Sequence, residues 1–380
     1  MTRSIILPPA DPLEADGART AGWWQGSDDE SVLCNLCPRH CRIVPGKRGF
    51  CFVRENRAGR LVSATYGRST GFCIDPIEKK PLFHFFPGTA VLSFGTAGCN
   101  LGCRYCQNWT MSRSRDVAAG SELAQPETIA NAATQLDCKS VAFTYNDPII
   151  WAEYAIDTAA ACRAAGVKTV AVTSGYITEQ ARAEFLRYID AANVDLKGFT
   201  EAFYHDYCGG QLAPVLDTLR YLARETEVWL EITNLVIPGA NDSPAEIEQM
   251  CQWIARELGP DVPLHFTAFH PDFQVNDRGP TPRETLLMAH RIARRAGLHH
   301  IYTGNLDDPE HQATLCPECG QVVIGRHGYV LTPYRITDGR CSHCGAPIAG
   351  RFADGPGDWG GRRLPIRIAN YAISPSPRKV

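Results

Sequence analysis

Hydrophobic and polar positions in the central part of the chain alternate between two patterns. Short apolar runs predict β-strands at Ala90–Thr96, 140–145, 168–174, 191–197, 227–237 and 263–269. Between them, apolar residues recur every three to four positions, which predicts helices at 126–137, 149–166, 178–189, 243–259 and 281–297, with one more ending at 225. Six strand–helix units predict parallel strands joined by crossover helices, and therefore an α/β fold.

Details of the pattern agree with this fold class. The third run, VAVTS, has little polar alternation, as expected for a strand that is buried on both faces. Helix starts are marked by Pro126, Thr178, Ser243 and Thr281, because a hydroxyl caps a helix and proline suits its first turn. Six units fit either an open doubly wound sheet or a barrel with fewer than eight strands.

Polar side chains follow several of the predicted strands. In parallel α/β sheets the carboxyl ends of the strands form one rim, where active sites are built. Taken alone, the Asn146–Asp147 pair could cap the next helix, and the Asp195–Lys197 pair could be a structural ion pair. Their convergence on one rim favours a site instead. The candidates are Tyr145, Asn146, Asp147, Ser174, Asp195 and Lys197.

Composition and charge limit the classes of function. The chain has 380 residues, of which 44% are hydrophobic and 21% charged, with a formal net charge of -3. This balance gives no electrostatic reason to expect nucleic acid or an anionic membrane as a partner. No apolar run reaches the length of a membrane span, and the first residues lack the features of a signal peptide. We expect a cytoplasmic protein.

The number and the grouping of the cysteines indicate metal binding. Sixteen cysteines without an export signal are not expected to form a disulfide framework. Five of them stand alone and are interpreted as buried thiols. The others form three groups, which predict three metal centres: Cys34, Cys37, Cys41 and Cys51; Cys99, Cys103 and Cys106; and Cys316, Cys319, Cys341 and Cys344.

The middle group lies in the stretch GCNLGCRYCQNW, directly after the first predicted strand. A closed [4Fe-4S] cluster and a structural zinc site both take four thiolates. Three thiolates on one short loop leave a metal with an open position, as in catalytic metal sites. The alternative is a site that a distant cysteine closes.

The spacing C-x3-C-x2-C, with Tyr105 before the third cysteine, resembles the signature of radical SAM enzymes. In that superfamily three thiolates hold a [4Fe-4S] cluster, and S-adenosylmethionine (SAM) chelates the fourth iron. An electron from the cluster cleaves SAM and releases a 5′-deoxyadenosyl radical. The resemblance implies a partial (β/α)6 barrel of the TIM type and an electron donor such as a flavodoxin or ferredoxin.

The resemblance extends over roughly residues 31–350. The segments DPIEKKPLFHFFPG, CNLGCRYCQNW, FTYNDP, VTSGYIT, DLKGF, LVIPGAND and IYTGN are similar to the radical enzyme of the AmmeMemoRadiSam system. That family is related to the pyruvate formate-lyase activating enzymes. The similarity implies hydrogen abstraction from a substrate, which for the activating enzymes is a protein glycine, and partners of the Memo and Ammecr types. It does not identify the substrate.

Roles for single residues follow from the same resemblance. Cys99, Cys103 and Cys106 are expected to bind the cluster, with Tyr105 beside it. Tyr145, Asn146 and Asp147 occupy the place of the motif that contacts the SAM amino group. Ser174 matches a position that contacts the SAM ribose and carboxylate, and Asp195 and Lys197 match an acidic–basic pair. The family pattern has Glu in place of Asp147 and Asn in place of Ser174, so the chain departs from it at these two contacts.

The two outer cysteine groups predict further metal sites. Cys316, Cys319, Cys341 and Cys344 form two C-x2-C-G knuckles around a β-rich insert, a pattern typical of a zinc ribbon with a structural zinc ion. The insert lacks a dense basic–aromatic cluster, so nucleic-acid binding is not expected. Cys34, Cys37, Cys41 and Cys51 also supply four ligands, and both zinc and an auxiliary [4Fe-4S] cluster are compatible with them. The spacing does not decide between the two, although zinc is slightly favoured.

These patterns give a domain organisation. We expect a tail at 1–30, a cysteine-rich metal-binding element at 31–75, a radical SAM core at 76–305, a zinc ribbon at 306–350 and a tail at 351–380.

Two other classes of function remain open. An electron-transfer iron–sulfur protein would need no SAM site, and a zinc-dependent binding or scaffold module would contain no iron.

Overall fold

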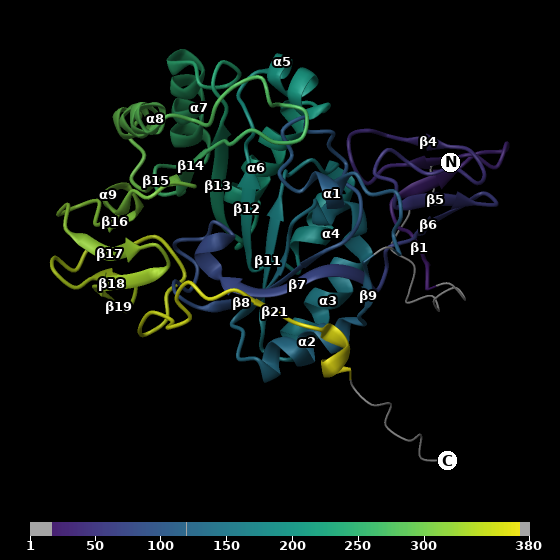
Figure 1. Ribbon diagram of the computed structural model, residues 1–380, viewed down its shortest axis with the longest axis horizontal. Coiled ribbons are helices and arrows are strands. Elements are labelled where there is room, and N and C mark those ends of the chain that lie inside the picture. Colours follow the sequence, from purple (N-terminus) through teal and green to yellow (C-terminus); the bar gives the residue numbers. More distant parts are fainter. Residues whose placement is uncertain (1–16, 119, 373–380) are drawn as a thin grey trace.

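A mostly parallel β-sheet forms the centre of the molecule in the computed structural model, which describes residues 17–118 and 120–372 (Figure 1). Its seven parallel strands lie side by side in the order β15-β14-β13-β12-β11-β10-β8. They are β8 (Ala90–Gly95), β10 (Ser140–Phe143), β11 (Lys168–Thr173), β12 (Ala191–Asp195), β13 (Trp229–Val236), β14 (Leu264–Ala268) and β15 (Ile301–Gly304). The six predicted strands are all present, and the α/β fold with parallel strands is confirmed.

Four strands of this sheet were not predicted, and the shortest of them include β9 (Glu122–Leu123), which pairs antiparallel with the start of β7 (Arg68–Pro76). β15 follows the last predicted helix and extends the parallel order at one end. At the other end β7 (Arg68–Pro76) pairs antiparallel with β8, and β21 (Leu364–Pro365) pairs antiparallel with β7. β7 contains glycine, charged residues and proline, so its apolar pattern is weak. β21 is two residues long and lies in the segment expected to be a tail, which carries no strand signal by itself.

Helices connect the parallel strands. They are α2 (Pro126–Gln135), α3 (Ala152–Ala164), α4 (Glu179–Leu186), α6 (Ala213–Glu225), α7 (Pro244–Glu257) and α8 (Arg283–Arg295), with short helices α1 (Trp109–Ser112), α5 (Glu201–Phe203) and α9 (Pro309–Gln312). Short 3-10 turns lie at η1 (Ile77–Lys79), η2 (Pro148–Trp151) and η4 (Ile368–Tyr371), and a π-helical turn at η3 (Tyr204–Cys208). The predicted helix starts are confirmed at Pro126, Thr178 and Ser243, whereas α8 begins after Pro282.

The N-terminal cysteine-rich element is built from two small antiparallel sheets. One has the order β1-β6-β5 and the other the order β2-β3-β4. Their strands are β1 (Arg19–Thr20), β2 (Trp24–Gly26), β3 (Val32–Cys34), β4 (Arg42–Ile43), β5 (Arg54–Arg57) and β6 (Arg60–Ser63). β1 and β2 therefore lie within the segment expected to be a tail. The element is attached to the core in part by Thr178, whose Oγ1 donates to the main-chain oxygen of Asn35, 2.7 Å away, rather than to its own helix.

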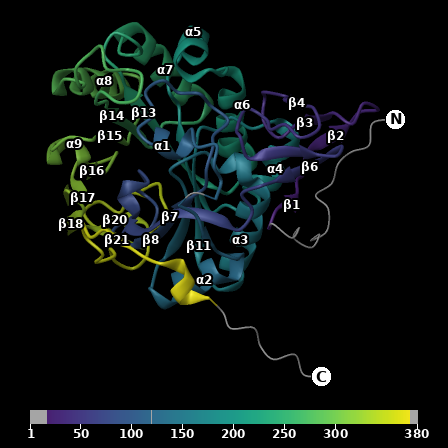
Figure 2. The same cartoon turned by 45° about the vertical axis from the view of Figure 1, so that its right-hand side comes forward.

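The C-terminal cysteine segment also forms small sheets. β16 (Thr314–Leu315), β17 (Val322–His327) and β18 (Val330–Tyr334) make one sheet, and β19 (Ile336–Thr337) and β20 (Arg340–Cys341) make the other. Arg326 of β17 is buried and donates to the main-chain oxygen of Phe83 in the core, 2.8 Å away. Both views place these strands and the N-terminal sheets on opposite sides of the central sheet (Figures 1 and 2).

Apolar packing holds the layers together. β8, β10 and β14 are buried along their whole length, as the weak polar alternation of the strands predicts. One large cluster of buried residues joins the N-terminal element to the helices and strands of the core. Within the described ranges, no helix combines the length and apolar character that a membrane span requires.

Candidate active site

The three-cysteine loop begins directly after β8 and is held by the end of the neighbouring strand β10. The Asn146 amide donates to the main-chain oxygen of Gly98, 2.8 Å away, and to Oγ1 of Thr96, 3.1 Å away, while its side-chain oxygen accepts from the Thr96 amide at 3.1 Å. Gly98 has a φ of +85°, and a Cβ at this position would overlap the main-chain oxygen of Cys51. Only glycine fits here, because the loop turns against the N-terminal element.

The loop places its three thiols on one cavity. Cys99, Cys103 and Cys106 line a hollow of about 330 Å³ at the carboxyl ends of the parallel strands. Sγ of Cys106 also lies 3.2 Å from Oγ of Ser112 in α1. Burial, followed by the nearby Asp147 carboxylate, raises the pKa of the Cys99 thiol. A bound metal would have to displace these protons, as ligand thiols do.

All the predicted rim residues line this same cavity. Besides the three cysteines they are Tyr105, Tyr145, Asn146, Asp147, Ser174, Asp195 and Lys197. The prediction that the strand ends bring them together is confirmed. The structure adds residues from the later strands, which the sequence did not single out: Thr233, Leu235, Thr267 and Asn305. Their positions in the cavity do not by themselves assign a role to each side chain.

Asp147 is strongly bonded to its own chain. Its two carboxylate oxygens accept from the Ser174 amide and the Thr173 hydroxyl, each at 2.9 Å, from the Ile149 amide at 3.2 Å, and from the Ser174 hydroxyl. A carboxylate offers about four acceptor positions, so these donors occupy nearly all of them. Burial nevertheless raises the pKa of this carboxyl group. The geometry supports the capping role that was the alternative for Asp147.

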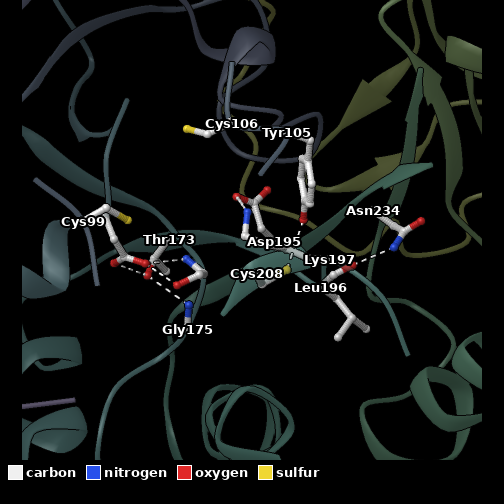
Figure 3. A network of polar contacts seen from close by, with 12 residues as sticks. Cys99, Tyr105, Cys106, Thr173, Gly175, Asp195, Leu196, Lys197, Cys208 and Asn234 are labelled. Atoms are coloured by element: carbon white, nitrogen blue, oxygen red, sulfur yellow. Dashed lines mark hydrogen bonds and ion pairs between the residues drawn. The ribbon is translucent and has the colours of Figure 1, made fainter. Parts of the chain in front are cut away.

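Asp195 and Lys197 form an ion pair at the end of β12. The Lys197 Nζ lies 3.0 Å from Oδ2 of Asp195 (Figure 3). Burial lowers the pKa of Lys197, but the Asp195 carboxylate and the neighbouring Cys103 outweigh this effect and hold that pKa well above its usual value. The pair therefore presents one fixed cation and one half-exposed carboxylate to the cavity, a combination that can bind a zwitterionic ligand.

A fourth thiol lies behind the loop and was missed by the sequence analysis. Sγ of Cys208, at the end of η3, is 3.3 Å from the Tyr105 hydroxyl (Figure 3). It also contacts the Cys103 thiol. The η3 backbone also binds the loop, since the Gly102 amide donates to the oxygen of Cys208 at 2.8 Å. Cys208 is fully buried and does not line the cavity. It was interpreted as a lone core thiol because it follows no cysteine spacing.

A charged group on β7 and η1 supports the other side of the cavity. The Tyr145 hydroxyl donates to Oδ2 of Asp75, 3.3 Å away, and Lys80 Nζ lies 2.8 Å from the same atom. Lys80 is buried, whereas Lys79 is half-exposed and lines the cavity. Neighbouring lysines in a loop are usually solvated. The structure instead places one member in a buried ion pair, which fixes Tyr145 beside the cysteine loop.

The C-terminal cysteines converge on one point. Cys316, Cys319, Cys341 and Cys344 bring their sulfur atoms within 4.8 Å of one another. The Cys316–Cys344 and Cys319–Cys341 sulfur distances are 3.6 and 3.9 Å. Four Zn–S bonds of ~2.3 Å in a tetrahedron would separate the sulfurs by about 3.8 Å. The four residues can therefore hold a metal ion, and their geometry is consistent with a zinc-ribbon site.

The chain is similar in sequence to several known proteins. A profile of the radical SAM superfamily matches residues 94–254. The uncharacterized protein MJ0808 of Methanocaldococcus jannaschii is 40% identical over 332 residues, covering 87% of this chain and 98% of its own length. The pyruvate formate-lyase 1-activating enzyme of Escherichia coli K12 is 23% identical over 192 residues, covering 48% of this chain and 75% of its own. A solved domain of a pyruvate formate-lyase-activating enzyme from Bacteroides vulgatus has a TM-score of 0.39 at 20% identity and covers 44% of this chain and 99% of that one.

The chain belongs to the radical SAM superfamily. It is a radical SAM enzyme related to the pyruvate formate-lyase activating enzymes, and membership of the superfamily implies a [4Fe-4S] cluster and SAM as cofactors. The residues present fit these groups. Three thiols from one loop face a polar cavity of about 330 Å³, while the fourth nearby thiol, Cys208, is turned to Tyr105 and away from it.

Proposed function

We propose that this protein is the radical enzyme of an AmmeMemoRadiSam system and abstracts a hydrogen atom from a substrate as the glycyl-radical activating enzymes do. Cys99, Cys103 and Cys106 would hold the [4Fe-4S] cluster at the carboxyl ends of a partial (β/α)6 barrel. When bound, the cluster supplies the electron that cleaves SAM to methionine and a 5′-deoxyadenosyl radical. One observation carries the proposal: three loop thiols and the polar strand ends line a single cavity.

The cavity argues for an enzyme over an electron-transfer protein. An electron-transfer cluster needs four ligands and no ligand space beside it. Here the three thiols border a hollow whose volume, about 330 Å³, lies in the range of small-molecule sites. Polar groups from several strands face this hollow, as required to orient a ligand near reactive thiolates.

The chain's own residues would bind and orient the SAM molecule. Lys197 can pair with the SAM carboxylate and Asp195 with a cationic or hydroxyl group, because both charges face the cavity at the end of β12. Asp147 would act indirectly: by binding Thr173 and Ser174 it fixes the two residues at the end of β11 that line the cavity. Holding one substrate hydrogen near the radical carbon would set the specificity, since such a radical attacks most C–H bonds.

Basic side chains around the loop support an electron-donor partner such as a flavodoxin or ferredoxin. Arg104 within the loop and Arg115 after it are exposed. Arg113 lies over the ring of Phe50 at 5.7 Å, and Arg115 over that of Phe52 at 4.9 Å. A positive rim beside the cluster would steer a negatively charged donor to it. Memo-type and Ammecr-type proteins are further proposed partners. We also propose that the C-terminal site holds zinc. The proposed location is the cytoplasm.

The direct test is SAM cleavage. Anaerobically reconstituted protein with dithionite and SAM should release 5′-deoxyadenosine, and the triple variant Cys99→Ala, Cys103→Ala, Cys106→Ala should release none. Cys138→Ala, which changes a buried cysteine outside the three groups, is the matched control. Continued 5′-deoxyadenosine formation by the triple variant would refute the assignment. Transfer of deuterium from a labelled cell extract into 5′-deoxyadenosine would then lead to the substrate.

A further inference from the structure

The four N-terminal cysteines surround a second, separate cavity. Cys34 ends β3, Cys37 and Cys41 lie between β3 and β4, and Cys51 lies between β4 and β5. All four line one small enclosed hollow of about 20 Å³. Asn100 of the three-cysteine loop lines the same hollow. The four N-terminal cysteines thus form one site, which lies directly behind the loop proposed to hold the radical SAM cluster.

The spacing of its thiols differs from that of the C-terminal group. In the described part of the chain, only the C-terminal cysteines form a set of three or more metal-ligating side chains whose ligand atoms all lie within 4.8 Å of one another. Sulfurs around a single zinc ion are about 3.8 Å apart, given Zn–S bonds of ~2.3 Å. A cubane cluster places four irons between its thiolates, so its ligands stand farther apart. The N-terminal cysteines resemble Cys99, Cys103 and Cys106 in this respect, since neither group converges on a point.

The N-terminal cysteines also share one enclosed space. The N-terminal thiols keep a cavity of about 20 Å³ between them, although the site is enclosed by protein. The four side chains therefore belong to one site that the protein shields from solvent.

A buried arginine beside the site lacks one partner. Arg54 lines the cavity and is 2% exposed. Its terminal nitrogens bind Glu153 at 3.0 Å and the main-chain oxygen of Gly22 at 2.6 Å. Its Nε has no partner among the described residues. A buried N–H is rarely left unpaired, and a cluster sulfide or thiolate would supply the missing acceptor.

We propose that Cys34, Cys37, Cys41 and Cys51 bind an auxiliary [4Fe-4S] cluster rather than a zinc ion. The protein then carries two iron–sulfur clusters and one zinc ion. The second cluster lies next to the first, because Asn100 belongs to both the loop and this cavity, and Gly98 lies against the main-chain oxygen of Cys51. Arg54 would donate from Nε to a sulfur of the cluster.

Metal analysis of the wild-type protein tests this inference. After anaerobic reconstitution we expect about eight irons, about eight sulfides and about one zinc per chain, with Mössbauer spectra that assign all the iron to [4Fe-4S] clusters. About four irons with about two zincs would overturn the proposal in favour of zinc. About four irons with about one zinc would overturn it as well, because the N-terminal site would then hold no metal.

Variants separate this inference from the proposed function. The triple variant Cys99→Ala, Cys103→Ala, Cys106→Ala should keep about four irons, about four sulfides and one zinc, and should still give a [4Fe-4S] signal on reduction. Adding Cys37→Ser and Cys41→Ser should remove that iron and leave the zinc. Cys251→Ser in α7, at a buried cysteine that lines neither cavity, is the control and should remove no metal. A triple variant without iron would overturn the proposal even if the wild type cleaves SAM.

Discussion

The Oδ2 atom of Asp147 accepts a hydrogen bond from the main-chain amide of Ser174, 2.9 Å away, and so joins the end of β10 to the end of β11. The same carboxylate also accepts from the Thr173 hydroxyl at 2.9 Å and caps η2 through the Ile149 amide at 3.2 Å. One buried acid thus holds two neighbouring strand ends at the rim of the cavity. In the proposed SAM site, its part would be to position its neighbours.

Replacing Asp147 by Ala should mainly destabilise the protein. The substitution leaves buried donors of Thr173, Ser174 and Ile149 without an acceptor, which should lower the free energy of unfolding by about 3 kcal/mol. The dissociation constant for SAM, followed through the electron paramagnetic resonance spectrum of the reconstituted cluster, should rise less than it does in Asp195→Ala, because Asp147 acts only through the residues that it positions. Asp195→Ala is the comparison, because its carboxylate is half-exposed and faces the cavity: it should weaken SAM binding with little effect on stability. The opposite pattern in the two variants would make Asp147 a direct SAM ligand.

Cys208 should raise the reduction potential of the cluster held by the loop. Its thiol contacts Cys103 and Tyr105 while staying outside the cavity, so it can donate a hydrogen bond to the Cys103 sulfur once that sulfur is a thiolate. Hydrogen bonds to cluster sulfurs raise the reduction potential, so Cys208→Ala should lower it. A redox titration of the cluster by electron paramagnetic resonance measures the shift. Cys162→Ala, at a buried cysteine in α3, controls for the loss of a core thiol, and an equal potential in both variants would assign Cys208 to packing.

In the C-terminal ribbon, one set of residues should bind the metal and another should attach the ribbon to the core, so that substitutions can separate the two effects. Cys316→Ser should remove about one zinc per chain and destabilise the segment, because the metal supplies its folding energy. Arg326→Ala should keep the zinc but release the segment, since it removes the bond of 2.8 Å to the main-chain oxygen of Phe83 in the core. Zinc analysis and limited proteolysis distinguish the two effects. Arg335→Ala, at an exposed position of the same segment, should change neither, and a Cys316→Ser protein with full zinc content would refute the ribbon site.

Stability should fall in mild acid because of His300. Burial lowers the pKa of this histidine to about 3, and neither ring nitrogen has a partner among the described residues. A folded-state pKa below the unfolded value of 6.5 means that the unfolded chain takes up the proton first as the pH falls. The stabilisation is therefore complete above pH 6.5 and decreases below it, by about 2 kcal/mol at pH 5.

The variant His300→Leu isolates this effect. It removes the titrating group, so its free energy of unfolding should change less steeply between pH 7 and pH 5 than that of the wild type. The difference in slope should correspond to about one fewer proton taken up on unfolding. His205→Leu, whose histidine side chain is 86% exposed, is the control and should keep the wild-type slope. Equal slopes in all three proteins would show that His300 is not protonated on unfolding in this range.

Much of the fold could be predicted because it depends on local patterns. The six predicted strands and their helices are marked by apolar runs, by helical periodicity and by caps such as Ser243 with Pro244. The rim site could also be predicted, since parallel strands necessarily bring their carboxyl ends together. For that reason Asp195 after β12 and Cys99 after β8 line one cavity, although they are far apart in the sequence.

Other features depend on contacts between distant segments, which a local pattern does not contain. The strands β7, β15 and β21 form because partner strands are present at the edges of the sheet, not because their own residues strongly favour a strand.

By itself, the amino-acid sequence determined that the chain has three cysteine groups and that three thiols share one short loop after a strand. Only the tertiary structure decided that Cys208 lies behind that loop, that Asp147 is bonded to its own chain, and that the N-terminal thiols stay apart while the C-terminal thiols converge. The reason is physical: spacing along the chain fixes which ligands are available, whereas the distances between their sulfur atoms depend on how separate segments pack.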